Sequence, residues 1–135
     1  MSDAKLVGIV LVSHSGPVAD SVAKLAVGLA GGGTAPVAAA GGTPDGGLGT
    51  SSELIAQAAH SVDRGAGVAV LVDLGSAVLT VKALLAEGDE LPDSTRLLDA
   101  PFVEGAVAAV VTASAGADLD AVAAAAGEAY DYRKV

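Results

Sequence analysis

The stretch LVGIVLVSHSGP, residues 6–17, changes from apolar to polar at a single point and decides how the rest of the chain is interpreted. Residues 6–13 form a nearly continuous aliphatic run, which is typical of a strand covered on both faces in a parallel sheet. The polar triplet SHS, residues 13–15, stands at its end, and Pro17 suits the first position of a helix. A histidine at this strand tip is expected to face the start of a helix rather than the core.

Strand and helix signals alternate along the remaining sequence. A second clear buried strand, GVAVLVDLG at 67–75, ends at Asp73. Thr50 and Glu53 form a T-x-x-E capping box, which predicts that a helix begins near residue 51. The first helix carries four apolar residues at helical spacing: Val18, Val22, Leu25 and Leu29. The expected strands are 6–13, 36–40, 67–75 and 96–100, and the expected helices run from Pro17 to the glycines at 31–33 and over 51–62, 76–86, 102–114 and 119–130.

This alternation predicts an α/β fold, a doubly wound and mainly parallel four-stranded sheet with helices on both faces and the strand order 2-1-3-4. A chain of 135 residues has the usual size of one domain, so residues 1–135 are expected to form a single domain. In such folds, functional groups gather at the carboxyl ends of the strands, where the strand order reverses. His14 and Asp73 are therefore expected to lie at that edge.

Composition argues against several classes of function. The formal net charge is −9 and the sequence has no basic stripe, which argues against binding of DNA or RNA. The chain has no cysteine, which removes disulfides and thiolate ligands, and with only two histidines it predicts no metal site. It shows neither a signal-peptide pattern nor an apolar run long enough to span a membrane. We therefore expect a cytoplasmic protein that requires no membrane and no cofactor.

His14 is the sharpest functional signal, because the end of a strand just before a helix start can bind an anion. A histidine that is merely hydrogen-bonded to neighbouring backbone is the plainer alternative. If the first and third strands are neighbours, the Asp73 carboxylate can accept a hydrogen bond from one ring nitrogen of His14. The other nitrogen is then unprotonated, as a nucleophile requires. Asp73 as an ordinary turn or cap residue remains an alternative interpretation.

Residues with free amides or hydroxyls near this edge are candidates for holding a phosphate group. Glycine allows the backbone to approach a phosphate, and helix starts supply amide donors. The same features also serve ordinary turns and helix caps, so the alternatives stay open for the loop GGTPDGGLGTS at 41–51. The phosphate-binding candidates are Ser15, Gly16, Thr50, Gly75 and Ser76.

Several common catalytic patterns are missing from the sequence. It contains no G-x-S-x-G elbow and no G-x-G-x-x-G motif, and no lysine follows the glycine-rich loop as a P-loop requires. Hydrolase chemistry, dinucleotide binding and nucleotide hydrolysis therefore lose support. The second histidine, His60, lies in a predicted helix and is expected at the surface or half-buried.

Five stretches spread over nearly the whole chain carry a resemblance to a known family: IVLVSHS (9–15), GTSSELI (49–55), VLVDLGSAVLTVKALL (70–85), APFVEGAVAA (100–109) and ASAGADLDAV (113–122). They resemble the mannose-class IIA domains of the phosphotransferase system. Within that class they resemble the phosphotransfer subunit of phosphoenolpyruvate-dependent dihydroxyacetone kinase. The motif VSHS marks the class, whereas DLGSA together with APFVEG and SAGAD favours the dihydroxyacetone subunit over a sugar-transport IIA domain.

The resemblance implies a phosphoryl relay and a homodimer. In that family the histidine matching His14 accepts a phosphoryl group from the histidine phosphocarrier protein (HPr), and the aspartate matching Asp73 orients it. The group then passes to ADP held on the ADP-binding nucleotide subunit of dihydroxyacetone kinase. Because the chain ends at Val135, without room for a fused phosphocarrier or enzyme I-like domain, the donor is expected to be a separate protein. If Asp73 holds Nδ1, the phosphoryl group is expected on Nε2.

Three rival functions remain open on the sequence. A receiver-like signalling domain would use Asp73 as its phosphoacceptor, but it needs an acidic pair where this chain has Ser13 and His14. A sugar-transport IIA domain would differ in the acceptor of the phosphoryl group. An anion-binding module would bind phosphate without forming a covalent adduct.

Overall fold

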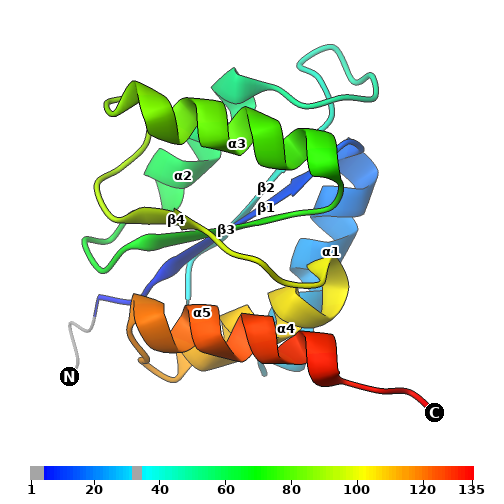
Figure 1. The fold of residues 1–135 in the computed structure, drawn as a ribbon, viewed down its shortest axis with the longest axis vertical. Helices are drawn as coiled ribbons and strands as arrows, with labels where there is room; N and C mark the ends of the chain where they lie inside the picture. The colour runs from blue at the N-terminus through cyan, green and yellow to red at the C-terminus, as the bar shows by residue number, and fades with distance from the viewer. Residues whose placement is uncertain (1–4, 32–34) are drawn as a thin grey trace.

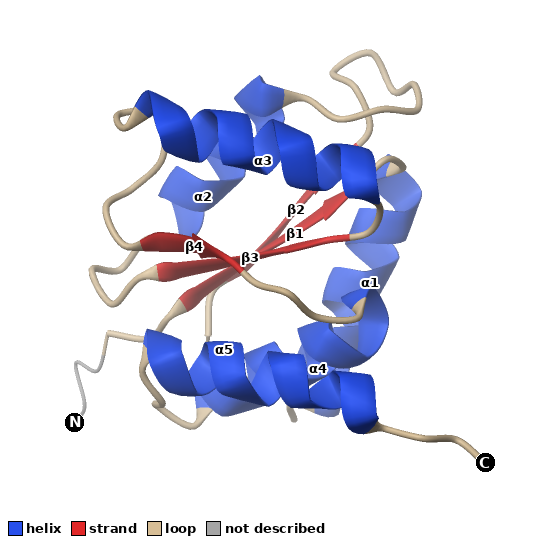
Figure 2. Cartoon of the chain, viewed as in Figure 1, coloured by secondary structure: helices blue, strands red, loops and turns tan. Residues whose placement is uncertain are grey.

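A computed structural model describes residues 5–31 and 35–135, in which a sheet lies between two layers of helices (Figure 1). Figure 2 shows the strands as one layer through the centre of the molecule. The elements in chain order are β1 (Gly8–Ser13), α1 (Gly16–Leu29), β2 (Val37–Gly41), α2 (Ser52–Val62), β3 (Val68–Val72), α3 (Gly75–Glu87), β4 (Thr95–Leu97), α4 (Phe102–Ser114), α5 (Leu119–Glu128) and a short 3-10 turn (Ala129–Asp131). Each predicted strand and helix is present, although β1, β3 and β4 are shorter than expected.

The sheet has the predicted strand order, β2-β1-β3-β4, and each neighbouring pair is parallel. β1 lies in the interior of the sheet, where Val12 pairs with Ala40 of β2 on one side and with Val72 of β3 on the other. The strand order reverses around β1, so the carboxyl ends of β1 and β3 open into the same crevice. His14 follows β1 at that edge and Asp73 follows β3.

Two cores form on the two faces of the sheet because side chains alternate along each strand. On one face, Ile9 and Leu11 of β1 pack with buried residues of α1, α4 and α5. On the other face, Val10 and Val12 pack with buried residues of α2 and α3. β1 is buried along its whole length, as its continuous aliphatic run predicts.

Of the four apolar residues at helical spacing in α1, Val22 is buried and the other three are exposed. Leu25 and Leu29 are 45% and 62% exposed, whereas the residues that α1 buries are Ala19, Val22 and Ala26. Alanine brings the helix backbone close to its neighbours, so small side chains occupy the close contact and the larger leucines stay at the surface. α1 ends at Leu29 with Ala30 as its C-cap, and residues 32 and 33 of the glycine run expected to end it lie outside the described residues.

The prediction that Thr50 and Glu53 form a capping box is wrong. α2 begins at Ser52, and its N-cap is Ser51, whose hydroxyl accepts a hydrogen bond of 3.2 Å from the amide of Leu54. The preference for a hydroxyl cap was met by the next residue along the chain. Thr50 is therefore available for another contact.

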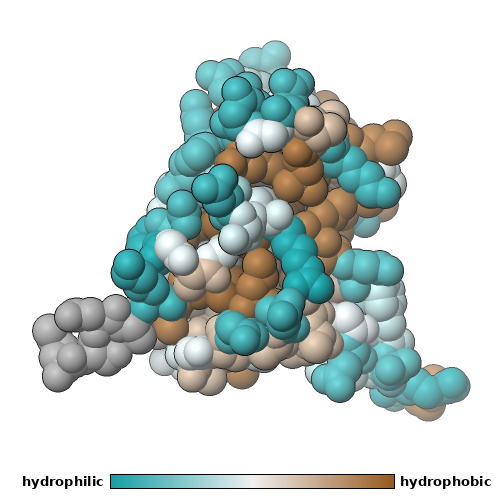
Figure 3. All heavy atoms as spheres, turned by 60° about the vertical axis from the view of Figure 1, so that its left-hand side comes forward, coloured by the Kyte–Doolittle hydropathy of each residue, from teal (hydrophilic) through white to brown (hydrophobic). Residues whose placement is uncertain are grey.

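Apolar side chains remain exposed on both helical layers. The space-filling view shows apolar atoms across the middle of one face, with hydrophilic residues around them (Figure 3). Leu79 of α3 is 70% exposed, and Leu25 and Leu29 of α1 are exposed on the opposite layer. Such patches on a small protein often mark contact surfaces.

Candidate active site

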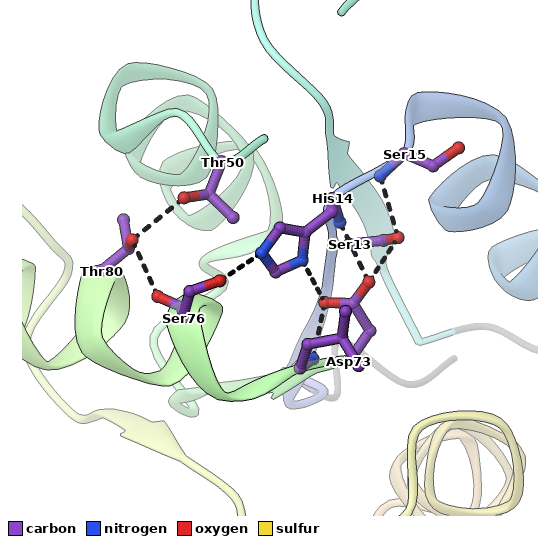
Figure 4. Close-up of polar contacts among 8 residues, drawn as sticks. Ser13, His14, Ser15, Thr50, Asp73, Ser76 and Thr80 are labelled. Atoms are coloured by element: carbon purple, nitrogen blue, oxygen red, sulfur yellow. Dashed lines mark hydrogen bonds and ion pairs between the residues drawn. The ribbon is translucent and has the colours of Figure 1, made fainter. Parts of the chain in front are cut away.

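The carboxyl ends of β1 and β3 bring His14 and Asp73 into direct contact, as the sequence predicts (Figure 4). Nδ1 of His14 lies 2.9 Å from Oδ1 of Asp73. The side chains are 24% and 16% exposed, so both sit at the mouth of the crevice rather than in the core.

The contact with Asp73 fixes the hydrogen on the His14 ring. A carboxylate can only accept, so Nδ1 carries the hydrogen and donates it, and Nε2 of the neutral ring is left as an acceptor. Nε2 in turn contacts the hydroxyl of Ser76, which donates to it. The outer nitrogen of His14 therefore carries no hydrogen and has the electron pair that a nucleophile needs, which the Ser76 hydroxyl caps.

Asp73 accepts hydrogen bonds from four donors. Oδ2 accepts from the Ser13 hydroxyl at 2.8 Å and from the backbone amide of His14 at 3.0 Å. Oδ1 accepts from the His14 ring and from the amide of Leu74 at 2.7 Å. Partial burial acts to raise the pKa of Asp73, but the hydrogen bonds from the His14 amide and ring, from Ser13 and from Leu74 together hold the pKa below its ordinary value.

Ser13 is a site residue whose role was not predicted from the sequence. It is the last residue of β1 and 1% exposed, and its hydroxyl both donates to Asp73 and accepts from the amide of Ser15 at 3.1 Å. Ser13 thus holds the carboxylate and the backbone around His14 together. The available signal was a polar residue at the last position of an otherwise apolar strand.

Helices α1 and α3 both begin beside His14 and leave amide groups open. Ser15 caps α1 by accepting from the amide of Val18, and the amide of Gly16 is the first of that helix. The N-cap of α3 is Leu74, whose apolar side chain cannot accept a hydrogen bond from the helix. The amides of Gly75 and Ser76 therefore have no intrahelical partner. Neither helix has an acidic residue in its first turn. Their N-termini can therefore stabilise a negatively charged group at the site.

Thr50 lies near the site, but its hydroxyl is directed toward Thr80 of α3 (Figure 4). The two hydroxyl oxygens are 3.0 Å apart. The residue before it, Gly49, donates its amide to the carbonyl of His14 at 2.9 Å, which ties the glycine-rich loop to the end of β1. The sequence singled out Thr50 and missed Thr80, because a threonine inside a helix carries no local signal of a long-range contact.

The second histidine lies away from this site, on α2. His60 is exposed, and its Nε2 lies 3.0 Å from the carbonyl oxygen of Glu90. The prediction that it lies at the surface or half-buried is confirmed, and the side chain is exposed.

Residues 8–123 match the model of the EIIA-man family, described as the PTS system fructose IIA component. The chain is 38% identical over 120 residues to the phosphoryl donor subunit DhaM of PEP-dependent dihydroxyacetone kinase from Pantoea ananatis, with 87% of this chain and 25% of that protein covered. It is 34% identical over 118 residues to the DhaM subunit of PEP-dependent dihydroxyacetone kinase 2 from Listeria innocua, with 87% and 94% covered. The crystal structure of EF1359, a protein of unknown function, superposes with a TM-score of 0.77 at 30% identity, with 91% of this chain and 94% of that one covered.

The chain therefore belongs to the EIIA-man family, and within it the chain is DhaM-like. It spans nearly the full length of the Listeria relative but only about a quarter of the Pantoea relative. None of the helices in the described part of the chain is both long and apolar enough to cross a membrane.

Proposed function

We propose that this chain is a phosphoryl relay, which accepts a phosphoryl group on Nε2 of His14 and passes it to a second partner. The observation that carries the proposal is the pairing of Nδ1 with Asp73, which leaves Nε2 unprotonated beside the open end of α3. In this proposal residues 1–135 act as one phosphotransfer domain in the cytoplasm, and the absence of cysteine is compatible with a reducing compartment.

The proposed reaction exchanges one nitrogen–phosphorus bond for another. The electron pair on Nε2 forms a bond to phosphorus while the bond to the donor's ring nitrogen breaks, and that electron pair returns to the donor ring. No proton has to leave Nε2, because Nδ1 carries the ring hydrogen. Asp73 stabilises the positive charge that the phosphorylated ring gains, and the hydroxyl of Ser76 turns from Nε2 to a phosphoryl oxygen.

The remaining oxygens of the phosphoryl group are held by groups already at the site. The amides of Gly16, Gly75 and Ser76 are donors at helix starts, and the hydroxyl of Ser15 lies on the neighbouring segment, whereas the hydroxyl of Thr50 is directed toward Thr80. Little covalent chemistry is required of the protein in phosphoryl transfer, so positioning and charge stabilisation account for the rate.

The proposed donor is the histidine phosphocarrier protein, and the proposed acceptor is ADP on the nucleotide subunit of dihydroxyacetone kinase. The relatives named as phosphoryl donor subunits of PEP-dependent dihydroxyacetone kinase support this kinase as the acceptor. A sugar-transport IIA domain is the second candidate, because the family model that matches is described as a fructose IIA component.

Exposed leucines around His14 support partners that are proteins. Leu48 precedes Gly49, Leu74 follows Asp73, and Leu79 lies one turn beyond Ser76. We call these three leucines the apolar collar, and they are 82%, 61% and 70% exposed. A surface of this kind lets a protein dock around the histidine and exclude water during transfer.

A homodimer is part of the same proposal. Leu25 and Leu29 of α1 line a common surface depression with Val103, Val111 and Tyr132. Each of these apolar side chains is at least 41% exposed. We call this surface the α1–α4 face, and a second copy of the chain would bury it.

Intact mass spectrometry tests the relay. The chain is incubated with phosphoenolpyruvate, enzyme I and the histidine phosphocarrier protein, in parallel with His14→Ala and with His60→Ala as the matched control. The native chain and His60→Ala are expected to gain one phosphoryl group, and His14→Ala is expected to gain none. Phosphorus NMR is expected to show attachment at Nε2, and attachment at Nδ1 would contradict the geometry. No adduct while the carrier itself is phosphorylated would favour the non-covalent anion-binding module.

A chase experiment separates the candidate acceptors. The phosphorylated chain is mixed with the ADP-loaded nucleotide subunit or with the next domain of a sugar-transport system. Rapid loss of the label to ADP supports the dihydroxyacetone kinase assignment, and loss only to the transport domain supports the second candidate. A label that is lost in alkali, where phosphohistidine survives, would instead indicate an acyl phosphate on Asp73, as in a receiver-like domain.

A further inference from the structure

Thr80 makes two hydrogen bonds on the side of α3 that faces the glycine-rich loop (Figure 4). It lies one helical turn after Ser76 and donates its hydroxyl hydrogen to the carbonyl of Ser76 at 3.2 Å. A hydroxyl has a single hydrogen, so the 3.0 Å contact with Thr50 must use the hydrogen of Thr50. Thr50 therefore donates to Thr80, and Thr80 donates to the backbone carbonyl of Ser76.

These two hydrogen bonds of Thr80 complete a ring of contacts around His14. On one side, the amide of Gly49 holds the carbonyl of His14, and Thr50 is the next residue. On the other side, the hydroxyl of Ser76 holds Nε2 of His14. The bond between Thr50 and Thr80 joins the two sides, so the loop that follows β2 and the first turn of α3 are fixed relative to each other across the histidine.

Thr80 is not one of the residues that α3 contributes to the hydrophobic core. The buried residues of that helix are Ala77, Val81 and Leu84, whereas Thr80 is half-buried at its edge. Valine has nearly the same shape as threonine, so replacement of the hydroxyl removes the two hydrogen bonds and leaves the packing in place. Thr80 can therefore be separated experimentally from the stability of the fold.

We propose that Thr80 is a positioning residue for the His14 site. Its hydroxyl holds the first turn of α3 against Thr50, so that the hydroxyl of Ser76 stays at Nε2. Thr80 also accepts the hydrogen bond from the Thr50 hydroxyl, so Thr50 does not donate to Nε2. The hydroxyl that donates to Nε2 before phosphorylation is therefore that of Ser76. This role rests on the proposed phosphoryl relay, which it deepens, but its first test does not depend on phosphorylation.

Nitrogen-15 NMR of the unphosphorylated protein is the first test. The chain has two histidines, so the ring of His60 is an internal control in the same spectrum. In Thr80→Val the Nε2 resonance of His14 is expected to move downfield, toward that of an imidazole nitrogen without a hydrogen-bond donor, while the His60 ring is unchanged. Thr80→Ser is expected to restore the native shift. An unchanged His14 ring in a folded Thr80→Val protein would overturn the proposal, whether or not the chain is ever phosphorylated.

The lifetime of the phosphorylated chain is the second test. The phosphohistidine of Thr80→Val is expected to hydrolyse about two- to tenfold faster than that of the native protein. This range follows from the loss of one hydrogen bond to the phosphoryl group. The double variant Ser76→Ala/Thr80→Val is expected to hydrolyse no faster than Ser76→Ala alone, because Thr80 acts through Ser76. Additive effects would contradict that dependence.

Thr95→Val is the matched control for both tests. Thr95 lies on β4 and donates its hydroxyl to the carbonyl of Pro92 at 2.7 Å, so the variant also loses a bond from threonine to a backbone carbonyl. It is expected to leave the His14 resonance and the phosphohistidine lifetime at native values. Equal effects in Thr95→Val and Thr80→Val would show a general loss of rigidity and would overturn a specific role for Thr80. If the chain accepts no phosphoryl group but the His14 ring responds to Thr80→Val, the relay fails and the positioning role stands.

Discussion

The hydroxyl of Ser13 donates to Oδ2 of Asp73 at 2.8 Å, although 60 residues separate the two in the chain. Ser13 ends β1 and Asp73 follows β3, so the bond joins two neighbouring strands at the point where both leave the sheet. His14 lies directly beyond it. The position of the carboxylate that orients His14 is therefore set from inside the protein, by a residue that solvent barely reaches.

Ser13→Ala is expected to lower the free energy of unfolding by about 1–2 kcal/mol, because Asp73 loses a donor and the amide of Ser15 loses an acceptor. Urea unfolding measures this change. Ser61→Ala is the control, because Ser61 only donates to a carbonyl of its own helix, at 2.7 Å. If the two variants lose the same stability, Ser13 has no special structural role.

Asp73→Asn is expected to slow phosphorylation of His14 by about 100-fold or more. The amide group of asparagine would donate to Nδ1, so the ring hydrogen would move to Nε2 and block the nucleophile. Single-turnover transfer from the phosphorylated carrier measures the rate, and the carbon and nitrogen shifts of the His14 ring report the tautomer. A native rate with the reversed tautomer would exclude Nε2 as the attacking atom.

The hydrogen bonds to Asp73 also predict how stability changes in acid. The pKa of Asp73 in the folded protein lies below the ordinary value of 3.8, so the unfolded chain takes up a proton first as the pH falls. The contribution of Asp73 is therefore complete above the unfolded pKa and is lost as the pH decreases through the folded pKa. Urea unfolding between neutral and acid pH is expected to show a smaller loss of stability in Asp73→Asn than in the native chain. Parallel curves would contradict this assignment.

Gly41→Ala is expected to destabilise the protein by about 1–3 kcal/mol, the usual cost of overpacking. A methyl group at Gly41 would lie 2.4 Å from the carbonyl oxygen of Ser15 and 2.7 Å from Cα of Gly16, so the turn after His14 would have to move. Gly28→Ala is the control, because nothing lies within 4 Å of the added methyl group in α1. It is expected to stabilise the helix by about 0.5–1 kcal/mol. Thermal unfolding of both variants checks the opposite signs.

Leu79→Ser and Leu29→Ser test the two apolar surfaces against each other. Leu79 belongs to the apolar collar, so its replacement is expected to raise the KM for the phosphorylated carrier about tenfold, equivalent to ~1.4 kcal/mol of lost contact, without changing the molar mass in solution. Leu29 belongs to the α1–α4 face, so its replacement is expected to shift a dimer toward monomer with little change in KM. Steady-state kinetics and light scattering measure the two effects. An exchange of the two results would mean that the surfaces are assigned to the wrong partners.

The sequence predicted the fold well because its strongest signals are periodic and local. The aliphatic run of β1 and the helices between the strands specify a parallel sheet, and the order of the strands then brings His14 to Asp73. The structure confirms that contact and adds Ser13 to it. The capping of α2 by Ser51 was missed because two neighbouring hydroxyl residues compete for one cap, and sequence alone does not rank them.

The parts of the site that the sequence did not predict depend on packing between distant segments. Thr80 meets Thr50 only because the loop after β2 folds against α3. The buried face of α1 is set by how closely alanine allows the helix to approach its neighbours, which hydrophobic spacing does not encode. Both are tertiary effects, which local sequence patterns do not encode.

The distribution of acidic side chains among the helices has a consequence for selectivity. α2, α4 and α5 each carry an acidic residue in the first turn, whereas α1 and α3, which begin at His14, carry none. A protein of net charge −9 repels free phosphate and phosphate esters at long range. Among these five helices, however, the two whose first turns carry no acidic side chain are the two that begin next to His14. In the proposed relay, a phosphoryl group brought in by a docked protein would pass that barrier with its carrier, so the molecule would discriminate between delivered and dissolved phosphate before any bond is made.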